Sequence, residues 1–124
     1  MLVLLLGLFA SLGCGKSAPA TVPVSGTVKL EGEPLVEGFL YFKTLETGAL
    51  ERFDIINGEF KGNAQVGLRR VEICANRPKM KPIDGANVEV QENIIHSSFN
   101  TESIVTADVT AEGPNRFAWD VKQK

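Results

Sequence analysis

Histidine and cysteine, side chains that enzymes often use as bases and nucleophiles near neutral pH, are scarce in this sequence of 124 residues. There is one histidine, His96, and there are two cysteines, Cys14 and Cys74. A cysteine nucleophile needs a nearby base or cation, and a serine nucleophile needs a histidine that faces it, whereas His96 directly precedes Ser97 and Ser98. We therefore expect no catalytic residue and no enzymatic activity, with Cys74 as a structural cysteine and His96 as an exposed loop residue.

The ligand patterns of metal and cofactor sites are missing from the sequence as well. Zinc sites need several Cys or His residues at close spacing, and calcium loops need regularly spaced acidic residues. Asp54 with residues 57–59 could form a calcium loop, but a hairpin turn uses the same residue types for its backbone geometry alone. No glycine-rich phosphate loop precedes an expected helix. The sequence predicts no metal ion and no other cofactor.

Charge and composition narrow the class of protein further. The chain has 13 basic and 15 acidic side chains with both signs interspersed, a formal net charge of -2 without a basic stripe for phosphates. We therefore expect no nucleic-acid partner. After position 13 the chain is rich in Val, Ile and Thr and has Gly and Pro throughout, which favours strands over helices. A remainder of roughly 110 residues suits one domain.

Residues 1–13 form an uncharged apolar run that ends directly before Cys14. This segment resembles a bacterial lipoprotein signal, in which small residues precede the cysteine that begins the mature protein. Thirteen residues are too few to cross about 30 Å of hydrocarbon as a helix. An ordinary cleaved signal and a core segment of the domain are the alternatives. The prediction is a signal peptide at 1–13, a lipidated Cys14 with a flexible tether at 14–21, and a domain at 22–124.

The lipoprotein resemblance implies both a partner and a location. Acyl chains on Cys14 would attach the protein to a membrane of the cell envelope, where it would face the periplasm or the exterior. A disulfide between Cys14 and Cys74 is the alternative use of these thiols in an oxidising compartment.

Short stretches of alternating polarity, separated by turn residues, predict about seven strands and no helix. Val24 and Val28 share one face of the first stretch, and Val71 and Ile73 share one face of a later stretch, so that Cys74 points away from the core. The fold class is therefore all-β, an antiparallel β-sandwich. The stretches are 22–30, 38–42, 50–60, 71–75, 88–90, 105–109 and 117–121.

Turn residues mark the connections between these stretches. Asn57-Gly58 suits a type I′ hairpin turn because both residues tolerate positive φ. Residues 77–87 contain two prolines and an Asp-Gly pair, which predicts a loop, and their basic side chains make this loop the most plausible contact surface.

Two aromatic side chains, Tyr41 and Trp119, could form the flat platform on which sugar rings stack. Trp119 alternates in phase with Phe117 and Val121, so we expect it to lie in the core.

Several motifs follow one another in a familiar order. They are VSGTV at 24–28, GEPL at 32–35, FLYF at 39–42, DIINGEF at 54–60, FNTES at 99–103 and NRF at 115–117. This order resembles the carboxypeptidase regulatory-like domain, a transthyretin-like and Ig-like β-sandwich, in the form common in small bacterial envelope lipoproteins of the planctomycete type. The resemblance covers residues 22–122, with one departure at Arg69, where the family usually has a tyrosine. It implies a fold and no catalytic residues to carry over.

The resemblance and the expected anchor together predict a membrane-anchored envelope lipoprotein with a non-catalytic module, structural or protein-binding, whose partner is an envelope protein or a glycan. A carbohydrate-binding module is the alternative. A transthyretin-like hydrolase fits less well, because those enzymes resemble this chain poorly: their site uses several histidines and a distinctive C-terminal tail, and this chain has only His96.

Overall fold

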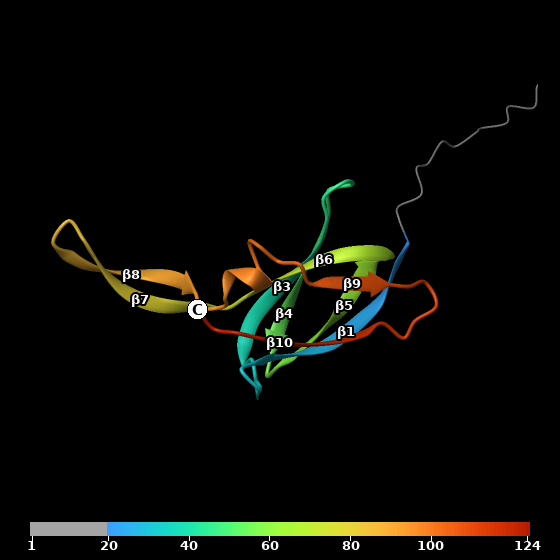
Figure 1. Cartoon of the computed structure of the whole chain (residues 1–124), viewed down its shortest axis with the longest axis horizontal. Coiled ribbons are helices and arrows are strands. Elements are labelled where there is room, and N and C mark those ends of the chain that lie inside the picture. Colours follow the sequence, from blue (N-terminus) through green and yellow to red (C-terminus); the bar gives the residue numbers. More distant parts are fainter. Residues whose placement is uncertain (1–19) are drawn as a thin grey trace, which may run out of the picture.

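The structure, a computed structural model, describes residues 20–124 (Figure 1). Within this range it contains ten strands, one short 3₁₀ turn named η1 (Ser97–Phe99), and no α-helix. Among residues 20–124 there is no helix that could span a membrane. The expected signal peptide at 1–13, the expected lipid attachment at Cys14 and most of the tether lie outside the described residues. The strands are β1 (Thr21–Leu30), β2 (Glu33–Pro34), β3 (Glu37–Thr44), β4 (Ala49–Ile56), β5 (Glu59–Gln65), β6 (Gly67–Cys74), β7 (Asn76–Ile83), β8 (Ala86–Asn93), β9 (Thr106–Val109) and β10 (Arg116–Val121).

Eight of the strands form one curled sheet in the order β10-β1-β5-β4-β3-β6-β9, with β2 attached to β1. At its middle, β4 and β5 share a single residue pair, Ile56 with Glu59. The sheet therefore folds over at this point into two layers, β10-β1-β5 and β4-β3-β6-β9. All pairings are antiparallel except β1 with β10, which is parallel. The predicted all-β, sandwich-like fold class is confirmed.

The core lies between the two layers and is built from alternate residues of each strand. Phe42 of β3 is fully buried at its centre, and its ring meets Phe60 and Phe117 of the opposite layer with centroids 6.2 and 5.9 Å apart. The buried faces predicted for the stretches 22–30 and 71–75, which lie in β1 and at the end of β6, are confirmed. The buried apolar side chains include Val24, Val28, Leu40, Phe42, Phe53, Ile55, Phe60, Val71, Ile73, Ala75, Ala107, Val109 and Val121.

The turn predicted between β4 and β5 is also confirmed. Asn57 and Gly58 have φ values of 52° and 80°, the left-handed conformation that a type I′ turn requires at both positions. Gly58 supports the turn further, because its N–H donates to the carbonyl of Leu35 at 2.8 Å.

The prediction that residues 77–87 form a loop is wrong. This segment belongs to a regular hairpin in which β7 and β8 pair over eight positions around a turn at Asp84-Gly85. In a two-residue hairpin the residue pair next to the turn exchanges two hydrogen bonds, the following pair exchanges none, and this alternation continues along both strands. Pro78 and Pro82 both lie in pairs that exchange no hydrogen bond, so neither removes a bond from the hairpin. The hairpin projects from one end of the sandwich (Figure 1).

Candidate functional site

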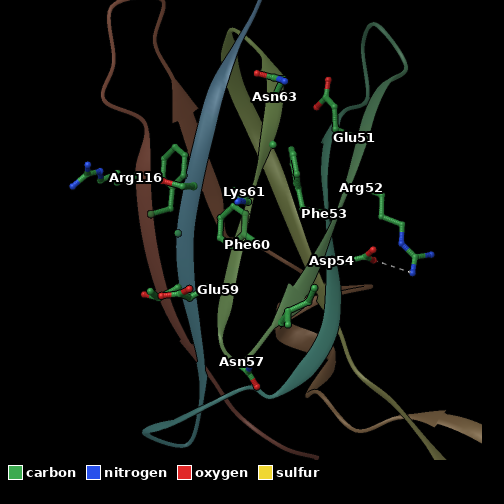
Figure 2. Close-up of a pocket in the computed structure, with 16 residues that line it drawn as sticks. Glu51, Arg52, Phe53, Asp54, Asn57, Glu59, Phe60, Lys61, Asn63 and Arg116 are labelled. Atoms are coloured by element: carbon green, nitrogen blue, oxygen red, sulfur yellow. Dashed lines mark ion pairs between the residues drawn. The ribbon is translucent and has the colours of Figure 1, made fainter.

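A groove opens on the side of the sandwich where β4 and β5 run apart (Figure 2). Its volume is about 1200 Å³, and β1 and β10 complete its wall. Asn57 lies at the hairpin end, while Glu51 and Asn63 lie at the opposite end (Figure 2). The charged side chains around it carry both signs and are those of Glu51, Arg52, Asp54, Glu59, Lys61 and Arg116.

The backbone along this groove is unpaired. Ile56 and Glu59 flank the two-residue turn and therefore exchange hydrogen bonds, and the strand alternation then turns the N–H and C=O groups of Arg52, Asp54, Lys61 and Asn63 toward the groove. No strand within residues 20–124 pairs with these groups. The two facing strand edges together offer a ladder of free donors and acceptors.

Two aromatic rings form the inner wall of the groove and separate it from the core. Phe53 lies on Gly62, and Phe60 lies on Gly26, with the two ring centroids 5.8 Å apart. A Cβ atom at Gly62 would come within 2.6 Å of the Phe53 ring, so a larger residue there would displace the ring. The glycines therefore allow the rings to close the interior while the strand edges above them remain apart.

A buried ion pair between Glu51 of β4 and Arg69 of β6 lies at the end of the groove away from the hairpin turn, and both side chains bond the backbone of Gln65 at the end of β5. The Arg69 guanidinium is 1% exposed, and its Nη1 lies 2.6 Å from Oε2 of Glu51. Arg69 also donates to the carbonyls of Phe42 at 2.9 Å and Gln65 at 3.2 Å. The other Glu51 oxygen accepts the Gln65 N–H at 3.3 Å, as expected for an N–H that points into the groove.

Sequence reasoning did not identify this ion pair, although part of the signal was present. Arg69 has the same parity as the inward-facing Val71 and Ile73, so the alternation already places it on the core face. Its partner Glu51 comes from a strand on the far side of β3, and nothing local in the sequence connects the two residues.

Cys74 and His96, the two residues considered for catalysis, are not brought together. Burial raises the pKa of the Cys74 thiol, with a smaller contribution from the Glu72 carboxylate, so the reactive thiolate is disfavoured. His96 is exposed at the start of η1, and its Nδ1 lies 2.8 Å from Oγ of Ser98. As predicted, Cys74 lies on the strand face opposite the core, and His96 is an exposed residue outside the strands.

No group of three His, Cys, Asp or Glu side chains within residues 20–124 could hold a metal ion. Asp54, considered above as a calcium ligand, instead lies 3.5 Å from the Arg52 guanidinium (Figure 2).

The aromatic side chains do not form a flat platform in the described part of the chain. Trp119 stacks on Phe60 and Phe117, with interplanar angles of 10° and 3°. Its side chain points toward the core, as its alternation with Phe117 and Val121 predicts, but it is only partly buried at the margin of the core. On the outer face of β3, Phe39 and Tyr41 meet at 76°, edge to face.

Comparison with known proteins finds no matching family model, no matching curated protein and no matching solved structure.

Proposed function

We propose that this chain is a membrane-anchored envelope lipoprotein whose β-sandwich, similar to a carboxypeptidase regulatory-like domain, binds a protein partner and performs no catalysis. The observation that carries the binding role is the groove with two unpaired strand edges. Soluble proteins normally cover or block such edges, because free N–H and C=O groups pair readily with another extended chain. The partner would contribute an extended segment that pairs with one of these edges.

The chemistry of the groove favours a peptide over other ligands. Its backbone groups alternate between donors and acceptors at the spacing of a strand, which only another polypeptide matches along its length. The rim carries both charge signs, so neither a polyanion nor a polycation has an advantage there.

Selection of peptides from a displayed library on the purified chain tests the binding role. We expect Asn63→Pro to weaken the binding of the selected peptides about fivefold, because it removes an N–H that faces the groove and is worth roughly 1 kcal/mol. Asn63→Ala is the matched control and should bind normally, since it keeps the N–H and removes only the side chain. Circular dichroism should show the same strand content in both variants. Equal binding by the two variants, or a library that yields no peptide, would contradict the proposal.

Attachment to the membrane is tested separately at Cys14. Because each buried acyl CH₂ contributes about 0.8 kcal/mol, loss of the acyl chains should release the protein. Cys14→Ser is therefore expected to move the protein to the soluble fraction or to leave an unprocessed precursor. Mass spectrometry of the native protein should find an N-terminus at Cys14 that carries lipid mass. An unmodified N-terminus elsewhere, or a disulfide between Cys14 and Cys74, would refute the anchor and leave the groove proposal untouched.

A further inference from the structure

The β7–β8 hairpin has no partner for either of its outer edges within residues 20–124. The two strands form a separate two-stranded sheet (Figure 1). Its base is attached to the sandwich, where Arg77 donates to the carbonyl of Glu37 at 2.8 Å. Further out, Met80, Ile83 and Val88 are 58%, 46% and 39% exposed. An isolated two-stranded hairpin is marginally stable in water, so a third strand would stabilise this one considerably.

The two outer edges of the hairpin differ in their ability to accept a strand. The pairing of Ile83 with Ala86 next to the turn decides which backbone groups point outward. On β7, two of the outward positions are Pro78 and Pro82, which have no N–H to donate. Prolines at outward positions are a common means of blocking strand addition.

The outer edge of β8 has no such block. Its outward positions are Asn87, Glu89 and Gln91, and each presents both an N–H and a C=O to the solvent. Strand addition to the hairpin is therefore directed to β8.

We propose that β8 pairs in antiparallel orientation with β8 of a second copy of this chain, around a two-fold axis at Val88. This register places Val88 opposite Val88 of the second copy, Ala86 opposite Val90, and Asn87 opposite Glu89. The result is a four-stranded sheet, β7-β8-β8-β7, formed by an isologous contact.

Self-complementarity is the reason for choosing a second copy as the partner. Ala86, Val88 and Val90 share one face of β8, so the pairing joins two identical apolar rows. The lysines on this face, Lys79 and Lys81, lie 3.1 and 4.0 Å from the Glu92 carboxylate, which offsets part of their charge. Both lysines belong to β7, so in the four-stranded sheet they lie on the outer strands, separated from those of the second copy by the two β8 strands.

The alternation also selects the register. An axis at Glu89 would place two carboxylates directly opposite each other, which is destabilising. The axis at Val88 instead faces each Glu89 with the Asn87 amide of the other copy.

Disulfide formation by Val88→Cys tests both the contact and its register. The full chain should also carry Cys14→Ser and Cys74→Ser, so that the new thiol is the only one. Val88 pairs with its own copy at a non-hydrogen-bonded position, where Cα atoms are about 4.5 Å apart, a distance that a disulfide can span. Val90→Cys is the matched control, because Val90 faces Ala86 and lies about 13 Å along the strand from its own counterpart. We expect an oxidised dimer for Val88→Cys alone; equal cross-linking of both variants, or of neither, would overturn the proposal.

Sedimentation of proline variants gives an independent measurement. Glu89→Pro removes an outward N–H from the β8 edge, and Met80→Pro does the same on the already blocked β7 edge; neither removes a bond within the hairpin. We expect the parent chain and Met80→Pro to dimerise with similar dissociation constants, and Glu89→Pro to dimerise at least tenfold more weakly. A parent chain that stays monomeric at high concentration, or a Glu89→Pro dimer as tight as that of Met80→Pro, would overturn the proposal.

Discussion

Glu51→Ala is expected to lower the free energy of unfolding by about 3–5 kcal/mol, the range measured when one partner of a buried ion pair is removed. The Arg69 guanidinium is 1% exposed in the parent chain, and Glu51→Ala would leave it with no opposing charge and only two carbonyl acceptors. A charge in the interior without an opposing charge is costly, and this cost is the reason for the expected loss. Urea unfolding followed by circular dichroism measures this change.

Two controls separate the ion pair from general effects of substitution. The double variant Glu51→Leu with Arg69→Met replaces both charges by apolar side chains and should be close to the parent chain in stability. Asp54→Ala breaks the exposed pair with Arg52 and should cost less than about 1 kcal/mol. If Glu51→Ala costs as little stability as Asp54→Ala, the ion pair between Glu51 and Arg69 does not stabilise this end of the groove.

Phe42→Ala is expected to destabilise the sandwich by a similar amount, about 3–5 kcal/mol. The Phe42 ring is fully buried between the layers and meets four other aromatic rings edge to face, with centroids 5.1 to 6.3 Å away. Removing it leaves a cavity that rings from both layers would have to fill, and each lost aromatic pair adds roughly 0.5–1.5 kcal/mol to the lost burial.

Tyr41→Ala is the matched control, because Tyr41 neighbours Phe42 on β3 but lies half-buried on the outer face. It should cost clearly less than Phe42→Ala when both are measured by the same urea titration. Equal losses would show that the inner face of β3 does not form the centre of the core.

Local patterns were sufficient to predict the strands of the sandwich and the faces that they bury. The alternation at Val24 and Val28, or at Val71 and Ile73, follows from the two-residue period of a strand, which a short window of sequence already contains. The Asn57-Gly58 turn was equally predictable, since the conformational freedom of these two residues is a local property.

Local patterns failed for the β7–β8 hairpin, and the reason is register. Pro78 and Pro82 are loop signals when the sequence is considered one segment at a time. A proline weakens a strand only when its missing N–H belongs to the pairing, and this depends on which residues of β8 lie opposite. That alignment is set by the turn at Asp84-Gly85. Once the strand pairing is known, the alternation of hydrogen-bonded pairs from this turn shows that the backbone nitrogens of both prolines point outward.

The sequence by itself determined the fold class, the core faces and the outward direction of Cys74, all of which follow from side-chain alternation. The tertiary structure alone decided where the groove opens and that Glu51 compensates Arg69. Both features depend on how two layers close over one core, with β4 and β5 diverging after a single shared pair. Such closure is set by the twist of each layer and by contacts between distant strands, which no local pattern encodes.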